Sequence, residues 1–260
     1  MCRHAAYLGH PIPLKQFLLD PPHSLEVQAY APRELQVARL NADGFGFAWY
    51  GTDRRPVTYV NAMPIWSDVN LEGLGRTLHS GLWLGSVRSA SVGFPSGPVN
   101  TQPFRAGGYL YSHNGYLAEF NLHTRPHLAR MLAPEITEGL CGNTDSEYIF
   151  ALIRQLLLEN PDLSMAAAIV EAFGLIAEWQ DEHIALLNLI VVDGRRIYAT
   201  RHAINSTCPT LYFTTDDESF PEGSQLVASE RMTEASFWQA VPEHHLLILD
   251  PEKPPELLAL

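Results

Sequence analysis

Residues 144–200 read TDSEYIFALIRQLLLENPDLSMAAAIVEAFGLIAEWQDEHIALLNLIVVDGRRIYAT and place two helix patterns directly before a hairpin pattern. Residues 144–147 have the S/T-x-x-E form of a capping box, and apolar residues then recur at helical spacing until Asn160-Pro161. A second helical pattern covers Ser164–Trp179. We therefore predict two consecutive helices in the middle of the chain.

The hairpin pattern that follows consists of two apolar runs joined through Asp193-Gly194, a pair typical of tight turns between antiparallel strands. Other strand patterns lie before and after the helices. The predicted strands are Ala5–Gly9, Gly44–Tyr50, Val57–Val60, Leu82–Arg88, Tyr109–Ser112, Leu186–Val192, Arg196–Thr200, Leu211–Thr215, Leu226–Ser229 and Leu246–Leu249. This order of strands, helices and strands predicts a layered α+β fold. The sequence has no strand pattern followed by GxGxxG and a helix, which argues against a dinucleotide-binding fold.

Composition restricts the class of protein. The 260 residues include 46% hydrophobic ones, which is ordinary for a globular domain, and the formal net charge is −12. Such an acidic chain repels phosphate backbones, so we expect no nucleic-acid partner. No run of 18 apolar residues and no signal-peptide pattern is present, so we expect no membrane association and a cytoplasmic location. We expect residues 2–260 to form a single domain.

The cysteines and histidines do not suggest a metal site. Cys2, Cys141 and Cys208 are far apart in the sequence and form no CxxC pair, so neither a disulfide framework nor a zinc site is indicated. The adjacent His244 and His245 would point in different directions in regular structure. We expect no metal and no cofactor.

Cys2 is the first residue with a possible chemical role. Removal of Met1 would leave a thiol and a free α-amine on one residue, and these groups titrate near ~8.5 and ~7.7–8.0, so they can exchange a proton without a separate histidine base. By its position alone, however, Cys2 is more simply read as a cysteine with no special role.

Three other features have both a chemical and a structural interpretation. Asn114 and Gly115 follow a predicted strand and could donate hydrogen bonds to an oxyanion, or form an ordinary turn. Arg88 stands among small residues and could bind a carboxylate, or pair with an acid at the surface. Asp145 begins a predicted helix and could bind an ammonium group, or act as a helix cap.

Together these residues belong to five motifs in a fixed order. They are the N-terminal Cys, Asn-x-Asp-Gly-x-Gly at 41–46, Arg-x-Ala-Ser-x-Gly at 88–93, His-Asn-Gly at 113–115 and Asn-Thr-Asp-Ser-Glu at 143–147. The chain thereby resembles the class II glutamine amidotransferases, which are N-terminal-nucleophile hydrolases. The resemblance extends over nearly the whole chain and implies a four-layer αββα sandwich.

One branch of this family is especially similar. The segments MCRHAAYLGHPIPL at 1–14, DPPHS at 20–24, NADGFGFAWY at 41–50 and VASE at 227–230 resemble the stand-alone γ-glutamyl hydrolases of ergothioneine biosynthesis. The substrate implied by this resemblance is γ-glutamyl-hercynylcysteine sulfoxide, which is cut to glutamate and hercynylcysteine sulfoxide. An aromatic lining would suit the trimethylammonium group of this substrate. Candidates by composition only are Trp49, Tyr50, Trp66 and Trp83, each of which is more simply interpreted as a core residue.

The resemblance also implies a role for each motif residue. Cys2 would attack the γ-carbonyl carbon and form a thioester, with Asn114 and Gly115 holding the oxyanion. The glutamyl group would be bound by Arg88 at its α-carboxylate and by Asp145 at its α-ammonium. The remaining substrate-binding residues would be Ser91, Gly93 and His113. Many glutamine-using relatives have Trp at the position of Ser89 and His at that of Val92, so we expect contacts near the glutamyl group or its leaving group to differ from those relatives.

Three functions remain open from the sequence. The chain could hydrolyse a small γ-glutamyl conjugate, or it could be a related enzyme, either a glutaminase subunit that supplies ammonia to a partner or a hydrolase of other γ-glutamyl peptides. It could also be a non-enzymatic interaction protein that keeps the fold. A homo-oligomer or a pathway enzyme as partner is left open. Residues 20–41 and 89–108 are predicted to be irregular loops that form walls or lids.

Overall fold

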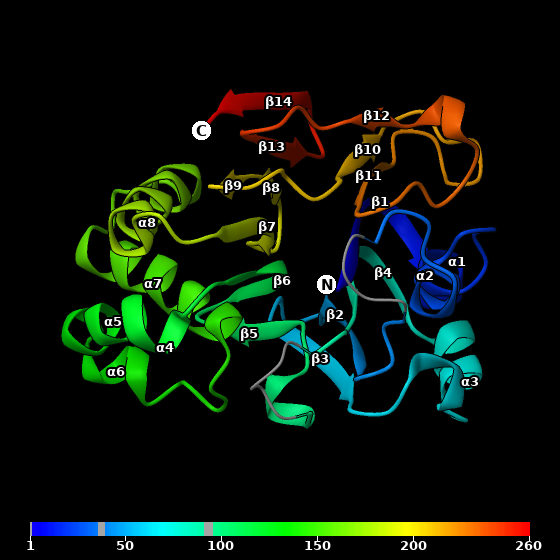
Figure 1. The fold of residues 1–260 in the computed structure, drawn as a ribbon. Helices are drawn as coiled ribbons and strands as arrows, with labels where there is room; N and C mark the ends of the chain where they lie inside the picture. The colour runs from blue at the N-terminus through cyan, green and yellow to red at the C-terminus, as the bar shows by residue number, and fades with distance from the viewer. Residues whose placement is uncertain (1, 36–39, 91–95) are drawn as a thin grey trace.

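The computed structural model describes residues 2–35, 40–90 and 96–260. Two antiparallel sheets face each other, and helices cover the outer face of each sheet (Figure 1). This arrangement is a four-layer αββα sandwich, so the predicted fold class is confirmed. The sheets have the strand orders β12-β10-β11-β1-β4-β2-β3 and β14-β13-β8-β7-β6-β5, with β9 paired to β7.

The strands of the first sheet are β1 (Arg3–Pro13), β2 (Phe45–Tyr50), β3 (Pro56–Asn61), β4 (His79–Val87), β10 (Tyr212–Thr214), β11 (Gln225–Ala228) and β12 (Gln239–Ala240). Those of the second sheet are β5 (Phe104–Ala106), β6 (Tyr109–Leu117), β7 (Ala185–Val192), β8 (Ile197–Arg201), β9 (Ala203–Ile204), β13 (His245–Asp250) and β14 (Lys253–Ala259). The α-helices are α1 (Leu14–Leu18), α2 (Leu25–Tyr30), α3 (Leu71–Thr77), α4 (Phe120–His123), α5 (Arg125–Met131), α6 (Pro134–Thr137), α7 (Asp145–Glu159) and α8 (Met165–Gln180). Short 3-10 helices lie at Ile65–Ser67, Pro98–Asn100 and Ala235–Phe237.

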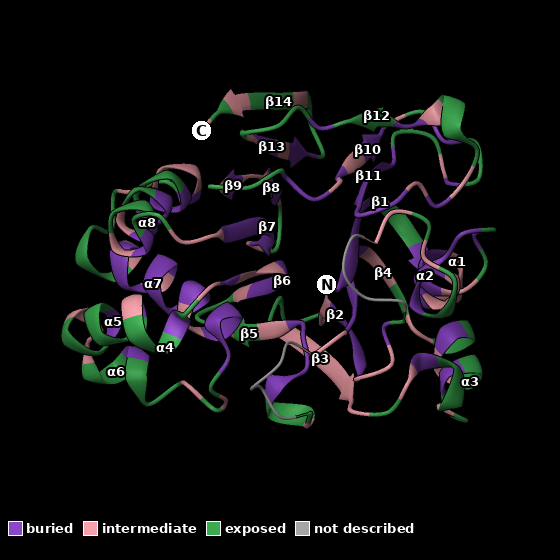
Figure 2. Ribbon diagram, viewed as in Figure 1, coloured by how far each residue is buried: buried purple, intermediate pink, exposed green. Residues whose placement is uncertain are grey.

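Three clusters of buried side chains correspond to the three interfaces between the four layers (Figure 2). Between the sheets, residues such as Leu84 of β4 meet residues such as Ile190 of β7. The outer clusters join the first sheet to α1–α3 and the second sheet to α7 and α8. β1 and β7 are central in their sheets and contribute to these clusters on both faces, so β7 is apolar at every position except Asn188 and β1 has an apolar run at Ala5–Leu8.

The predicted helices and strands all form, although some begin or end at other residues. Further short helices and strands lie between them. The segment 20–41, predicted to be irregular, contains α2, whose first turn is capped by the Ser24 hydroxyl accepting from Val27 N. The described part of 89–108, the other segment predicted to be irregular, contains a 3-10 helix at Pro98–Asn100 and the strand β5. β14 is also missing from the prediction, because residues 251–255 are rich in proline. Proline is tolerated there because β14 is an edge strand that pairs only with β13.

The two predicted central helices are α7 and α8. Thr144 caps α7 by accepting from Glu147 N, but Glu147 does not complete the expected box in the usual way, since its carboxylate accepts from Cys141 N and Gly142 N. α8 continues through Gly174, although glycine lowers helix propensity. In the part of the chain that the structure describes, no helix is long and apolar enough to cross a membrane.

Candidate active site

A small polar pocket lies where the start of β1, the end of β4, the end of β6 and the start of α7 meet. It combines residues from four of the five sequence motifs. Its lining residues are Cys2, Arg88, Ser89, Asn100, Gln102, His113, Gly115, Thr144, Asp145 and Ser146. Five of the eight predicted site residues are therefore brought together, namely Cys2, Arg88, His113, Gly115 and Asp145.

Cys2 lies immediately before β1, which is a central strand of its sheet. β1 pairs with β4 so that Arg3 is opposite Val87, and this register places Cys2 beside the residues that follow β4. The Cys2 side chain is nearly buried, and its Sγ lies 3.8 Å from the carbonyl oxygen of Ser89. The thiol is thus inside the pocket and within reach of a ligand there.

Arg88 is fixed by the Asn-x-Asp-Gly-x-Gly motif of the segment before β2. Its N–H donates to Gly44 O at 2.8 Å, and its Nη1 donates to Asp43 O at 3.4 Å. The Asp43 carboxylate in turn accepts from Ala90 N at 2.8 Å. Gly44 has a φ of +123°, and a Cβ there would lie 2.9 Å from Thr101 Oγ1, so this position requires glycine. The motif therefore holds the backbone that carries the guanidinium.

The small face of β2 is closely approached by the segment that contains Gln102. A Cβ at Gly46 would lie 2.5 Å from the carbonyl oxygen of Gln102. The Gln102 side chain then clamps the backbone of His113, since its Oε1 accepts from His113 N at 2.5 Å and its Nε2 donates to His113 O at 3.2 Å. Gln102 thereby joins the β2 motif to the His-Asn-Gly motif.

His113 uses both ring nitrogens within the protein. Nε2 donates to Leu186 O at 2.7 Å, so Nδ1 accepts from the Ser146 hydroxyl at 2.9 Å. Burial lowers the pKa of His113, while the charge of Asp145 and the bond to Leu186 oppose that shift. The ring contributes to the pocket wall as a neutral group that joins β6, β7 and α7.

Asn114 and Gly115 differ in their access to the pocket. A Cβ at Gly115 would lie 1.9 Å from Leu186 O, which explains the glycine, and Gly115 lines the pocket. Asn114 is fully buried and its Nδ2 donates to Ser229 Oγ at 3.4 Å. It is absent from the described residues that line the pocket, so its oxyanion role stays a prediction.

Asp145 is the first residue of α7 and is not its cap, since Thr144 has that role. Its Oδ2 accepts from Leu117 N at 2.8 Å and its Oδ1 accepts from Ser146 N at 2.7 Å. The carboxylate is buried and lines the pocket. It is therefore positioned by backbone donors on two elements and can face a cationic ligand group.

Ser91 and Gly93 lie outside the described residues, so their predicted contacts are untested. Asn100, Gln102 and Ser229 were not predicted from the sequence as parts of the site. Asn100 and Gln102 belong to none of the five motifs, and Ser229 belongs to the VASE segment, which indicated only similarity to one branch of the family.

Comparison with known proteins identifies the family. The family model described as class II glutamine amidotransferases matches residues 19–210, which is more than half of the chain.

The chain belongs to the class II glutamine amidotransferases.

Curated relatives of this amidotransferase extend over nearly its whole length. A protein of Mycolicibacterium smegmatis named gamma-glutamyl-hercynylcysteine sulfoxide hydrolase is 31% identical over 247 residues, with 95% of each chain covered. A protein of the same name from Mycobacterium tuberculosis is 29% identical, with 95% of this chain and 92% of the relative covered. A Saccharomyces cerevisiae protein named "Probable glutamine amidotransferase" is 29% identical, with 96% and 82% covered. These relatives confirm the predicted enzyme class, a hydrolase of amide C–N bonds.

Solved structures confirm the fold of the amidotransferase. A glutamine aminotransferase class-II domain protein from Silicibacter pomeroyi has a TM-score of 0.69 and 26% identity, with 99% of both chains covered. The glutamine PRPP amidotransferase of B. subtilis has a TM-score of 0.64 at 14% identity, with 99% of this chain and 49% of that chain covered. The second likeness concerns the fold alone.

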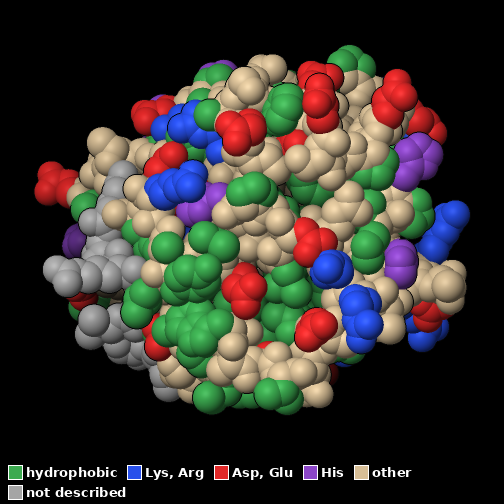
Figure 3. Space-filling model, turned by 90° about the vertical axis from the view of Figure 1, so that its right-hand side faces the viewer, with side chains coloured by type: hydrophobic (Ala, Val, Ile, Leu, Met, Phe, Trp, Pro, Cys, Tyr) green, Lys and Arg blue, Asp and Glu red, His purple; other side chains and the backbone are tan. Residues whose placement is uncertain are grey.

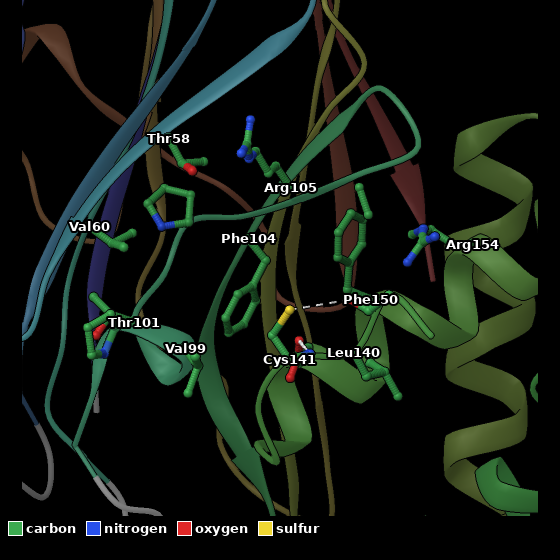
Figure 4. A pocket seen from close by; sticks show the side chains of 15 residues that line it. Thr58, Val60, Val99, Thr101, Phe104, Arg105, Leu140, Cys141, Phe150 and Arg154 are labelled. Atoms are coloured by element: carbon green, nitrogen blue, oxygen red, sulfur yellow. Dashed lines mark hydrogen bonds between the residues drawn. The ribbon is translucent and has the colours of Figure 1, made fainter. Parts of the chain in front are cut away.

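A second cavity of the amidotransferase shares a wall with the Cys2 pocket but contains none of the predicted site residues. Asn100 and Gln102 line the Cys2 pocket, whereas Val99 and Thr101 from the same segment line this cavity. Figure 4 shows Cys141 beside Phe104 at its centre, with the Arg105 and Arg154 side chains nearer its rim.

One mixed group of donor atoms was not expected from the sequence. Cys208, Glu243 and His244 place their ligand atoms within 4.8 Å of one another, and no other such group of three was found in the described ranges. The Arg201 guanidinium lies 3.2 Å from the Glu243 carboxylate and offsets the negative charge that would attract a cation. The expectation that His244 is not a ligand stays a prediction.

The four aromatic candidates for a leaving-group lining do not line the Cys2 pocket. Trp83 is fully buried, Trp49 packs near it, and the Tyr50 hydroxyl donates to Gly108 O and Val192 O. Trp66 is exposed and forms an edge-to-face pair with Tyr30. Hydrophobic side chains gather on the face of the molecule that carries α1–α3 (Figure 3). Trp49 and Trp83 thus pack in or against the core, which was the simpler interpretation of both residues.

Proposed function

We propose that the protein hydrolyses a γ-glutamyl amide bond, with Cys2 as nucleophile after removal of Met1. The observation that carries the proposal is the pocket that combines the Cys2 thiol with one buried cation, Arg88, and one buried anion, Asp145. A glutamyl group has an α-carboxylate and an α-ammonium on the same carbon. Arg88 would bind the α-carboxylate and Asp145 the α-ammonium, and these two contacts would place the γ-carbonyl near the thiol.

In the proposed mechanism, the α-amine of Cys2 takes the thiol proton, and Sγ attacks the γ-carbonyl carbon. Hydrogen bonds from Gly115 N and the Asn114 amide stabilise the oxyanion. The C–N bond then breaks, the α-ammonium protonates the leaving amine, and a thioester remains. Water attacks the thioester with the α-amine as base, the C–S bond breaks, and glutamate and the free thiol are released. Ser91, Gly93 and His113 are proposed to complete the wall around the glutamyl group.

We propose γ-glutamyl-hercynylcysteine sulfoxide as the substrate within this class. The support is the name of the mycobacterial relatives at 29–31% identity, together with coverage of at least 92% of their length. The yeast relative, named as a glutamine amidotransferase, favours the alternative that glutamine is the better substrate and that ammonia passes to a partner. We further propose that residues 2–260 act as one domain.

The test is a substrate panel. Purified enzyme is offered γ-glutamyl-hercynylcysteine sulfoxide, glutamine, glutathione and a γ-glutamyl anilide, and glutamate release is measured. We expect the highest kcat/KM for the sulfoxide conjugate. Equal or faster turnover of glutamine would instead support the glutaminase alternative, and no turnover of any γ-glutamyl amide would contradict the proposed function.

Cys2→Ala provides the control for this panel. We expect it to abolish glutamate release without changing the unfolding transition, and the mass of the active protein should correspond to a chain that begins at Cys2. Full activity of a chain that retains Met1 would rule out the α-amine as base.

A further inference from the structure

Two segments that resemble the ergothioneine branch, residues 20–24 and 227–230, have no role in the mechanism above. They contact each other close to the start of β1, which follows Cys2. Segment 20–24 contributes His23, and segment 227–230 ends β11 and contributes Ser229 and Glu230. β11 is the neighbour of β1 on the side opposite β4. The residues that follow β11 are therefore adjacent to the start of β1 and to the nucleophile.

Glu230 is a buried carboxylate with four donors. Its Oε1 accepts from Arg3 Nε at 2.8 Å and from Glu34 N at 3.1 Å, and its Oε2 accepts from His23 Nε2 at 2.7 Å and from Arg33 N at 2.8 Å. Both Arg3 and Glu230 are about 1% exposed. Four bonds fill the acceptor capacity of a carboxylate, so its position is fixed from three directions.

Arg3 connects Glu230 to the nucleophile. While its Nε is bound to Glu230, its Nη1 donates to the carbonyl oxygen of Cys2 at 3.1 Å. β1 begins at Arg3, so the strand ladder starts one residue after the nucleophile. A hydrogen bond on the Cys2 carbonyl therefore restrains the rotation about the Cα–C bond of Cys2, which sets the direction of both Sγ and the α-amine.

Ser229 restrains the next residue and the predicted oxyanion donor. Its Oγ accepts from His4 N at 3.0 Å and from Asn114 Nδ2 at 3.4 Å, and its N–H donates to His4 O at 2.9 Å. The turn after β11 thus holds both the start of β1 and the side chain of Asn114.

We infer that Glu230, acting through Arg3, is a positioning residue for the N-terminal nucleophile. It touches no substrate, and it keeps the thiol and α-amine of Cys2 aligned with the γ-carbonyl. The inference rests on the proposed function, because it assigns a role within that reaction. It predicts that loss of the Glu230 carboxylate lowers the rate of the chemical step more than it weakens substrate binding.

The experiment compares Glu230→Gln, Arg3→Lys and the double variant with the wild type. We expect kcat on the γ-glutamyl amide that the wild type hydrolyses fastest to fall on the order of 10²-fold in each single variant, with little change in KM, because a displacement of about 1 Å costs that much. The double variant should be no slower than either single variant, since all three break the same connection. Alkylation of Cys2 by iodoacetamide, a small neutral reagent that needs no glutamyl pocket, should slow in parallel.

A matched control separates positioning from general loss of stability. Asp250→Asn disrupts another buried carboxylate that accepts from an arginine, Arg196 Nε at 2.6 Å, far from the motifs. We expect it to lower the unfolding midpoint without changing kcat. An unchanged kcat and alkylation rate in Glu230→Gln, additive losses in the double variant, or an equal loss of kcat in Asp250→Asn would overturn the inference. If the wild type hydrolyses no γ-glutamyl amide, the proposed function fails, and the alkylation rates alone still decide whether Glu230 positions Cys2.

Discussion

At the scale of single residues, the pocket has two charged side chains, Arg88 and Asp145, that can bind a ligand, and other residues of the protein position both of them. Arg88 is carried by a backbone that Asp43 and Gly44 fix, and Asp145 is held by N–H groups of Leu117 and Ser146. In both cases the backbone does most of the positioning. The charges therefore need little rearrangement when a zwitterionic ligand binds, and each should recognise one ligand group.

This division predicts how Arg88→Lys and Asp145→Asn change substrate use. Arg88→Lys keeps the charge and loses the planar fork, whereas Asp145→Asn loses the charge and keeps the shape. Hydrogen bonds to charged groups contribute about 1.5–3 kcal/mol, so we expect KM for the γ-glutamyl substrate to rise roughly 10- to 100-fold in each variant.

Substrate analogues provide the control for these two variants. An analogue without the α-ammonium should be handled equally by the wild type and Asp145→Asn, and an analogue without the α-carboxylate equally by the wild type and Arg88→Lys. If each variant were impaired by the same factor on every analogue, the assigned contacts would be wrong.

At the scale of elements, Gly115 shows how closely β6 and β7 must approach. The 1.9 Å separation between a Cβ added at this position and Leu186 O is too short for any side chain, and the obstacle is backbone, which cannot rotate away. We expect Gly115→Ala to lower the free energy of unfolding by about 3 kcal/mol or more, because it forces the strand pair apart. Urea unfolding measures the effect.

Gly174→Ala is the contrasting control within α8. No atom lies within 4 Å of a Cβ at this position, so the substitution should stabilise the protein by about 0.5–1 kcal/mol through helix propensity. A loss at Gly174 similar to that at Gly115 would mean that the cost reflects glycine replacement in general and not the approach of the two strands.

The elements also show what a sequence can and cannot predict. β2 and the helices α7 and α8 have a clear period, and β7 is an apolar run next to the turn pair Asp193-Gly194, so local patterns located them. α2 has only six residues and β14 contains two prolines, so their local signals are weak or contrary, and tertiary contacts decide them. In the site, the motif residues were predicted from their residue types and their order along the chain. Gln102 and Ser229 act through hydrogen bonds between segments that are distant in the sequence, and no local pattern reveals such bonds.

At the scale of the whole molecule, the fold wholly or partly buries several titratable groups. His4 lies on β1 between the sheets, with Nδ1 near Ser112 Oγ at 3.0 Å, and burial, helped by His113 and Arg3, lowers its pKa to about 3. Burial and His244 lower the pKa of His202 to about 4. For Glu230, burial would raise the pKa, but the bond from His23 together with Arg33 N, the charge of Arg3 and Glu34 N outweighs it and lowers the pKa to about 2.

These shifts predict that the protein loses stability in two stages as the pH falls. In the unfolded chain the histidines would titrate near 6.5 and Glu230 near 4.5. Between pH 6.5 and about 4 the unfolded state therefore binds at least two more histidine protons than the folded state, those of His4 and His202, and below pH 4.5 it also binds the Glu230 proton. The lowered pKa of His113 acts in the same direction. Each such proton lowers the free energy of unfolding by about 1.4 kcal/mol per pH unit within its window.

Urea unfolding at constant ionic strength between pH 8 and pH 4 measures this dependence. We expect a plateau above pH 7 and a decline that begins near pH 6.5, well above the range in which carboxylates titrate. His202→Asn should reduce the slope between pH 6.5 and 4 by one proton, whatever its effect on stability at pH 8, because it removes one of the histidines whose pKa is lowered in the folded protein. A free energy of unfolding that stayed constant down to pH 5 would mean that His4 and His202 are protonated in the folded protein, which would contradict a neutral, buried His4 on β1.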